Sequence, residues 1–430
     1  MIAAERVSTP LARALRNVGW LLTGKGVGAL LSLVYLGLAT RSLGVERFGQ
    51  FTLVLSTGQA VAALVGFRSW QMVIRFGVGA FKAGDSAQLG RLVRFCVLLD
   101  LAAAIAGVGI AAVAIDVMAP RLGWSDKLAH DALLFCGVLL LSVRQTAVGV
   151  LRLQDRFAAA AAADAVTPAM RFVGAIAAVL TGASIQDFLY VWAFSEFAAA
   201  LTYWALVIRT GPRLTGTWRD AARVPGEHPG LWHFAFVTNL NTTLNAAGRQ
   251  VIVLLVGLLA GPAAAGGYRI AYQLSQALAR LSDMFSNSIF PEFTRAHAGE
   301  ERDDLRRLFR QTTRLTVGIG IAIALIAPIV GVPILHLVGG KAYVAAYPLL
   351  VLLSFAAALD LMGVGFEPVL LGTGHAAHAF RIRLVNVVVL FASAGVLMPV
   401  WQETGAAVAT LLAALVGFVL FGRSAYRATR

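Results

Sequence analysis

Charged residues are scarce in this sequence. Only 13% of its 430 residues are Asp, Glu, Lys or Arg, whereas 58% are hydrophobic. No stretch is long and polar enough to form a separate soluble domain. Apolar runs of about 20 residues, the span of a bilayer core, recur instead along almost the whole chain. The scarcity of charge therefore indicates a polytopic helical membrane protein.

Cysteine is also rare. The two cysteines, Cys96 and Cys136, are expected near opposite ends of their helices, so we predict no disulfide between them. His375 and His378 form a lone His-x-x-His pair without further ligands, so no metal site is expected. Neither a Ser/His/Asp set nor a nucleotide-hydrolysis domain is visible, so we predict no enzyme and no cofactor.

Acidic residues are outnumbered, and the net charge is +14. In a soluble protein this excess would suggest nucleic-acid binding. Of the 36 Lys and Arg, however, 25 fall in alternate segments on one side of the predicted helices, five fall in the opposite loops, and six lie within helices. This asymmetry predicts that both termini are cytoplasmic, and it makes a nucleic-acid partner unnecessary.

Twelve membrane-spanning helices are predicted from the apolar runs. They cover roughly 17–40, 48–68, 92–115, 130–152, 158–182, 186–208, 232–260, 264–290, 312–336, 344–371, 379–401 and 404–424. The charged stretch 294–311 is read as an amphipathic cytoplasmic helix between the eighth and ninth spans.

The two halves of the chain share a sequence pattern. SLGVERFGQF in the first half aligns with LAGPAAAGGY in the second at an offset of 217 residues, pairing Gly44 with Gly261 and Gly49 with Gly266. Six helices in each half, in one orientation, predict an all-α membrane protein of two lobes related by a pseudo-two-fold axis along the membrane normal. The predicted parts are an N-terminal lobe (1–208), a cytoplasmic linker (209–230) that touches anionic lipid, and a C-terminal lobe (231–430).

Polar side chains form two stripes on the helices at 232–260 and 264–290. Their steps alternate between four and three residues, so each set lies on one helix face. Because unpaired polar groups at membrane depth are costly, the stripes must face protein or a wet cavity. The first stripe holds Thr238, Thr242, Asn245 and Arg249, and the second holds Arg269, Gln273, Gln276, Arg280, Asp283 and Asn287.

Other intramembrane charges are expected to neutralise one another. Matched depths pair Asp100 with Arg144, and Arg171 with Glu196. Asp283 is one turn from Arg280 and is a further candidate for pairing. Both readings of these residues stay open at this point: structural ion pairs, or coupling of transport to a proton or sodium ion. The remaining intramembrane acids are Asp164, Asp360 and Glu367.

Short motifs in both halves carry a family resemblance. The first half has Arg-x-Leu-Gly followed by an acidic residue, a glycine and an aromatic residue, in Arg41, Leu43, Gly44, Glu46, Gly49 and Phe51. The second half has Gly261, Pro262, Gly266 and Tyr268, followed by Phe290, Pro291 and Glu292. With these motifs the chain resembles the polysaccharide and O-antigen flippase family of the multidrug/oligosaccharidyl-lipid/polysaccharide exporter superfamily.

The resemblance implies two six-helix lobes facing each other in a V and meeting at the first, second, seventh and eighth helices. It also implies alternating-access transport of an undecaprenyl-pyrophosphate-linked oligosaccharide from the inner to the outer leaflet of the bacterial inner membrane, for O-antigen, capsule or exopolysaccharide. Implied partners are this lipid-linked oligosaccharide, membrane lipid, a polysaccharide polymerase and a chain-length regulator.

The implied substrate carries a pyrophosphate, which needs cations, and hydroxyls, which need amides and other hydroxyls. We expect Lys25, Arg249, Arg280 and Arg269 to contact the pyrophosphate. The sugar is expected to contact Thr242, Asn245, Gln273, Gln276 and Asn287. Structural alternatives are that Lys25 snorkels to the interface, that Arg280 pairs with Asp283, and that Arg269 sits at the outer interface.

Three other functions remain open. A cation-coupled exporter of small molecules from the same superfamily would need an acidic cavity, whereas the second-half stripes are net positive. A lipid II flippase usually carries two extra C-terminal helices, which are not among the twelve spans predicted here. A membrane-embedded assembly partner would not transport at all.

Overall fold

The computed structural model describes residues 10–212, 214–277, 302–372 and 375–428, and their regular structure is helical throughout. The first bundle, residues 10–210, comprises α1 (Pro10–Val65), α2 (Ser69–Ala83), α3 (Ser86–Met118), α4 (Asp126–Leu141), α5 (Gln145–Leu153), α6 (Phe157–Leu180) and α7 (Ile185–Thr210). A short connection holds η1 (Trp218–Arg223) and α8 (Val224–Glu227). The second bundle comprises α9 (Leu231–Ala260), a helix described over 262–277, α11 (Arg302–Gly339), η2 (Lys341–Ala346), α12 (Tyr347–Met362), α13 (Phe366–Gly372) and α14 (Ala376–Ala428).

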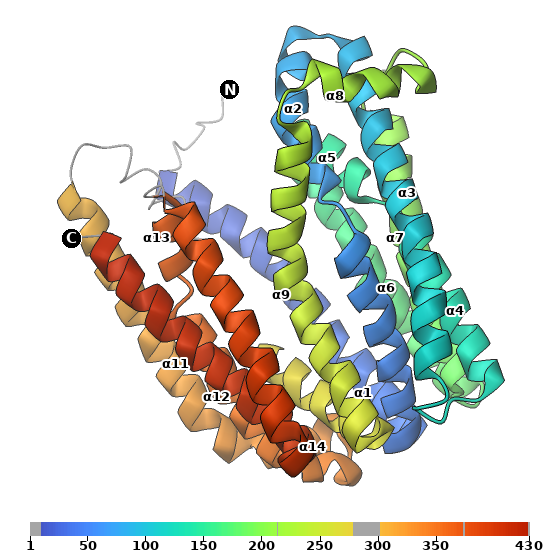
Figure 1. The fold of residues 1–430 in the computed structure, drawn as a ribbon, viewed down its shortest axis with the longest axis vertical. Coiled ribbons are helices and arrows are strands. Elements are labelled where there is room, and N and C mark those ends of the chain that lie inside the picture. The colour runs from blue at the N-terminus through green and yellow to red at the C-terminus, as the bar shows by residue number, and fades with distance from the viewer. Residues whose placement is uncertain (1–9, 213, 278–301, 373–374, 429–430) are drawn as a thin grey trace, which may run out of the picture.

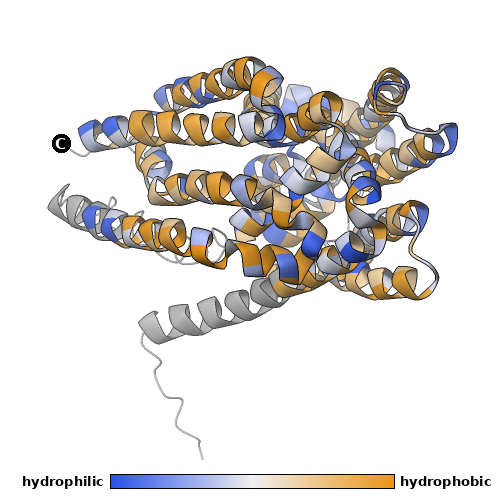
Figure 2. Cartoon of the chain, turned by 90° about the horizontal axis from the view of Figure 1, so that it is seen from below, coloured by the Kyte–Doolittle hydropathy of each residue, from blue (hydrophilic) through white to orange (hydrophobic). Residues whose placement is uncertain are grey.

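The described helices follow the order of the twelve predicted spans, and the part of the eighth span beyond residue 277 lies outside the described residues. Eight described stretches are long and apolar enough to cross a membrane, and two of them, at 54 and 52 residues, hold two spans each. The first pair is separated inside α1 at Gly44, and the last pair inside α14 at Gln402, where the backbone leaves helical geometry. Apolar residues dominate these helices, as Figure 2 shows. The predicted all-α membrane fold is confirmed.

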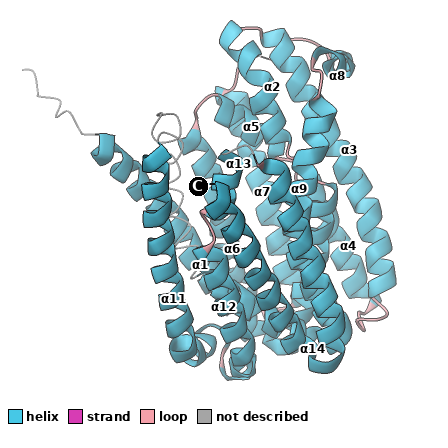
Figure 3. Ribbon diagram, turned by 60° about the vertical axis from the view of Figure 1, so that its left-hand side comes forward, coloured by secondary structure: helices cyan, strands magenta, loops and turns pink. Residues whose placement is uncertain are grey.

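The two bundles are arranged as a V (Figure 1). They meet at the end that carries the turns at Gly44 and Gly261, which we name the contact end. They separate toward the end that carries α8, which we name the diverging end; Figure 3 shows the same arrangement from another side.

Backbone geometry at the contact end confirms the repeat. Gly44 has φ 73° and ψ 176°, and Gly261 has φ 90° and ψ 169°. Residues with a Cβ atom rarely adopt this backbone conformation. Five residues after each turn the bundles touch: a Cβ on Gly49 would lie 1.9 Å from the Pro262 carbonyl oxygen. A Cβ on Gly266 would lie 3.2 Å from the Gly49 Cα. The matched glycines therefore meet across the predicted axis.

The contact end also involves α11. The guanidinium of Arg41 donates to the carbonyl of Leu337 at 2.6 Å, and the Thr40 hydroxyl lies 3.1 Å from the carbonyl of Val338. The ninth span thus joins the four spans that the family resemblance placed at the interface.

Two spans of the first bundle are broken at the same depth. The second span is interrupted between α1 and α2, and the fourth between α4 and α5. The carboxylate of Asp100 on α3 accepts hydrogen bonds from Ser69 and Thr146, each at 2.7 Å, just beyond the two breaks. The Trp204 indole donates to the Val143 carbonyl at 2.8 Å. Side chains thus satisfy polar groups that a break would leave bare in lipid.

The connection between the bundles is fixed to α3. Arg94 donates to the Thr215 carbonyl at 2.9 Å, and Arg91 pairs with Glu227 at 2.8 Å. Hydrogen bonds from Thr217 lower the pKa of Asp220 below its usual value.

The first turns of α9 pack against the first bundle. The Phe234 ring lies 5.7 Å from that of Phe76 and beneath the guanidinium of Arg75 at 4.5 Å. The α9 helix therefore belongs to both bundles.

One predicted element is corrected. Residues 302–311 are the first turns of α11 and run without interruption into the ninth span, so they do not form a separate connecting helix. Charged residues at a span's end are compatible with helix continuing beyond the bilayer. The rest of the predicted element, 294–301, lies outside the described residues.

Candidate functional site

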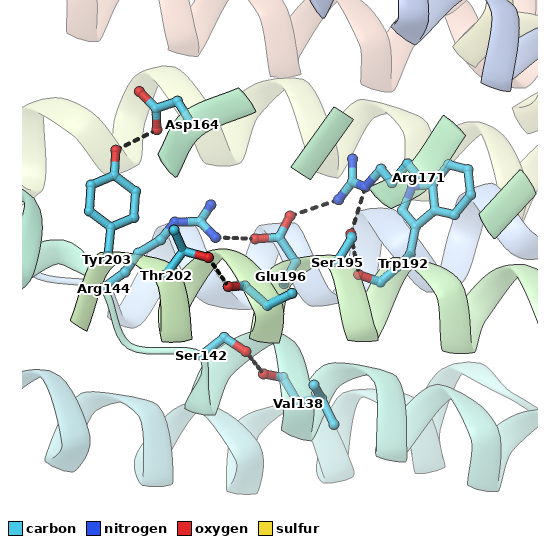
Figure 4. Close-up of polar contacts among 11 residues, drawn as sticks. Val138, Ser142, Arg144, Asp164, Arg171, Trp192, Ser195, Glu196, Thr202 and Tyr203 are labelled. Atoms are coloured by element: carbon cyan, nitrogen blue, oxygen red, sulfur yellow. Dashed lines mark hydrogen bonds and ion pairs between the residues drawn. The ribbon is translucent and has the colours of Figure 1, made fainter. Parts of the chain in front are cut away.

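A charge cluster lies inside the first bundle between α5, α6 and α7 (Figure 4). Glu196 accepts from Arg144 at 2.6 Å and from Arg171 at 2.7 Å, one guanidinium on each carboxylate oxygen. Arg171 also donates to the Ser195 hydroxyl at 3.1 Å and lies over the Trp192 ring. The predicted pair of Arg171 with Glu196 is confirmed.

The predicted pair of Asp100 with Arg144 is wrong. Arg144 stands at the break that precedes α5, where the chain leaves helical geometry, and its side chain reaches Glu196 on α7. The carboxylate of Asp100 instead accepts hydrogen bonds from the hydroxyls of Ser69 and Thr146. Matching depth along ideal helices fails here because the fourth span is not one continuous helix.

A larger polar space lies inside the second bundle. It is a cavity of about 630 Å³ between α9, the helix at 262–277, α12, α13 and α14. Arg249 is exposed in its wall and approaches the hydroxyl of Tyr272. The other polar lining residues are Gln276, Asp360, Glu367, Arg383, Asn386 and Thr410.

The described lining of the cavity holds charges of both signs. Arg383 forms an ion pair with Glu367 across the wall, and with Arg249 and Asp360 the described lining has two cations and two acids. The rings of Phe366, Phe418 and Phe421 supply apolar faces. Such a lining suits a ligand that has both anionic and hydroxyl groups, because guanidiniums bind oxyanions and amides bind hydroxyls.

The structure brings together only part of the predicted site. Arg249 and Gln276 share the cavity. Arg269 points elsewhere, donating to Gln250 at 3.2 Å and to Gln59 of the first bundle at 3.4 Å. Gln273 is half-buried on the same helix, outside the cavity's described lining. The side chains of Lys25, Thr242 and Asn245, and the whole of Arg280, Asp283 and Asn287, lie outside the described residues.

Sequence reasoning missed the wall made by the tenth and eleventh spans. Asp360 and Glu367 were expected as intramembrane acids but not as cavity residues, and Arg383 was counted only among the basic residues on the cytoplasmic side. The available signal was Gly363 and Gly365 between the two acids, since paired glycines mark a break in a span. Positions 383, 386 and 390 of the next span also follow a helical step, and all three line the cavity.

Comparisons with known proteins agree with this architecture. A family model described as "Polysaccharide biosynthesis protein" matches residues 40–348. The "Inner membrane protein YghQ" of Escherichia coli K12 is 29% identical over 344 residues, which are 78% of this chain and 95% of that protein.

Two solved structures share the fold. An inward-facing multidrug resistance MATE family transporter of the MOP superfamily aligns with a TM-score of 0.74 and 15% identity over 93% of this chain and 95% of that chain. The lipid II flippase MurJ, in an inward closed conformation, aligns with a TM-score of 0.73 and 11% identity over 94% and 86% of the two chains.

Proposed function

Because this chain belongs to the polysaccharide biosynthesis protein family, we propose that it moves an undecaprenyl-pyrophosphate-linked oligosaccharide from the inner to the outer leaflet of the bacterial inner membrane. The coarser statement, a multi-pass membrane transporter for polysaccharide synthesis, follows from the family and the transporter fold. The finer one rests on the cavity that holds Arg249 beside amides and aromatic rings.

The proposed mechanism is supported by where the bundles touch. The contact end is closed by backbone contact at Gly49, and the start of α1 and the end of α14 lie toward the diverging end. With cytoplasmic termini, as the distribution of basic residues favours, the substrate head enters from the cytoplasm. Closing the diverging end and opening the contact end then releases it on the other side, while the polyprenyl chain stays in the bilayer.

Arg249 is proposed to hold the pyrophosphate in the cavity, and Gln276 and Asn386 to bind sugar hydroxyls. A charged hydrogen bond contributes about 1.5–3 kcal/mol, which corresponds to roughly a tenfold to hundredfold change in binding. Lys25 and Arg280 remain proposed pyrophosphate contacts. A proton or sodium ion is the proposed energy source, and a polymerase and chain-length regulator are the proposed partners.

The test is transport of a fluorescent undecaprenyl-pyrophosphate oligosaccharide by purified protein in liposomes. Arg249→Ala should lower the initial rate about tenfold or more, whereas Arg381→Ala, an exposed arginine outside the cavity, should retain wild-type activity. A wild-type protein that fails to move the lipid would refute the function. Equal rates for Arg249→Ala and Arg381→Ala would refute the site alone.

A second candidate is favoured by Asp360 and Glu367, because carboxylates in a cavity can bind cationic small molecules. This cation-coupled exporter predicts that a deletion strain gains sensitivity to cationic drugs. The flippase predicts loss of surface polysaccharide with unchanged drug sensitivity. If the protein were a lipid II flippase, its expression would instead restore growth to cells depleted of their own lipid II flippase.

A further inference from the structure

A second polar surface runs along α1 where that helix faces the second bundle. Gly49, Thr52, Ser56 and Gln59 follow one another at steps of three, four and three residues, so they lie on one helix face. Both ends of this face are fixed against the second bundle, Gly49 at Pro262 and Gln59 at Arg269. Thr52 and Ser56 lie between those ends and therefore face the helix at 262–277.

The two hydroxyls on this face are buried and unsatisfied. Thr52 is 1% exposed and Ser56 is 0% exposed, and within the described structure neither hydroxyl has a hydrogen-bond partner. The neighbouring Thr57, which is equally buried, donates to the Leu53 carbonyl at 2.9 Å. An unsatisfied buried hydroxyl costs about 1–3 kcal/mol, so this arrangement of the bundles leaves two groups in need of partners.

The facing helix carries the repeat-related residues. The offset of 217 residues that pairs Gly49 with Gly266 also pairs Thr52 with Arg269, Ser56 with Gln273 and Gln59 with Gln276. The two polar rows thus start from touching glycines and face each other across the pseudo-two-fold axis. In this conformation Arg269 is held by the side-chain oxygens of Gln59 and Gln250.

We propose that this seam, formed by Thr52, Ser56, Gln59, Arg269 and Gln273, is a second binding surface for the hydroxyl-rich, anionic head of the substrate. It becomes accessible when the contact end opens. The hydroxyls then gain partners from sugar or water, and Arg269 exchanges glutamine oxygens for a phosphate. The proposed function supplies the ligand's chemical class; the opening of the seam does not depend on it.

The first test measures opening without any substrate. Ser56→Cys is made in full-length protein whose buried Cys96 and Cys136 are changed to alanine, and proteoliposomes are treated with a membrane-impermeant maleimide. Reagent on the side opposite the termini should label Ser56→Cys at least severalfold faster than Thr57→Cys. Adding Arg269→Ala, which removes the bridge to Gln59, should speed labelling further. Equal, negligible labelling of both positions from either side would overturn the proposal even if transport is intact.

The second test measures binding during transport. The double variant Thr52→Val and Ser56→Ala removes the unsatisfied hydroxyls, so its melting temperature should rise while its initial transport rate falls about threefold or more. Thr57→Val, the matched control, should lose stability and keep its transport rate. A stabilised double variant with wild-type transport would contradict a binding role for the seam. Absence of transport in the wild type would instead refute the proposed function and leave the labelling result standing.

Discussion

Single buried acids in the first bundle hold neighbouring side chains in place, and this structural role can be tested separately from transport. Asp100 accepts two hydroxyl donors beside two helix breaks, and Glu196 holds two guanidiniums. An amide oxygen can accept hydrogen bonds as a carboxylate does, but it cannot carry a proton at neutral pH. Replacing an acid by its amide therefore distinguishes a structural acceptor from a group that couples transport to an ion.

For Asp100 we expect the structural outcome. Asp100→Asn should fold and transport near the wild-type rate, whereas Asp100→Ala should lose about 2–4 kcal/mol of stability because it strands Ser69 and Thr146. Thermal unfolding in detergent and the liposome assay measure both, with the exposed Asp116→Asn as control. A well-folded Asp100→Asn protein without transport would assign Asp100 to coupling.

Glu196→Ala should be more damaging. It leaves Arg144 and Arg171 without their shared carboxylate, and removing one partner from a buried ion pair costs about 3–5 kcal/mol. A fall in melting temperature together with poor expression is the expected result. An unchanged melting temperature would mean that the cluster is solvated and contributes little.

Helix breaks and glycine contacts decide how the elements are placed. The turns at Gly44 and Gly261 set the direction of two helix pairs, and Gly49 lets the two halves approach at backbone distance. These are positions where a single added methyl group changes the relation between elements and leaves each helix intact.

Gly49→Ala should shift the molecule away from the present conformation. Its Cβ would clash with the Pro262 carbonyl at 1.9 Å, and backbone cannot rotate aside as a side chain can. Increased labelling of Ser56→Cys at the contact end is the readout. Gly79→Ala on α2, where a Cβ meets nothing within 4 Å, is the control. Labelling that stays at the parent rate would show that the bundles tolerate the methyl group.

For the whole molecule, the proposed transport mechanism requires that the contact end open. A Cβ on Gly37 would lie 3.9 Å from the Cα of Val338, which is close enough for a disulfide after small adjustment. Gly37→Cys with Val338→Cys should therefore stop transport when oxidised and restore it on reduction. Either single variant should transport under both conditions. Full transport by the cross-linked protein would exclude opening between α1 and α11.

The sequence predicted features that depend on period and composition. Apolar runs located the spans, and the repeat located Gly44 and Gly261, because these signals survive without knowledge of packing. The partner of Arg144 was missed because a break redirected its side chain toward Glu196. The wall with Asp360 and Arg383 was missed because the two residues come from different spans, and their meeting depends on how α12 and α14 pack.

The contact of Gly49 with Gly266 bears on how a chain with two repeated halves could arise from a symmetric dimer. A residue that touches its own repeat lies on the symmetry axis, and in a dimer of one six-helix chain it would touch its own copy. In such a dimer any substitution would appear on both sides at once. Joining the copies into one chain removes that restriction, so a threonine at position 52 can face an arginine at 269. The fused chain can thus keep a symmetric glycine contact while the residues of its two walls differ, as the proposed asymmetric ligand would need.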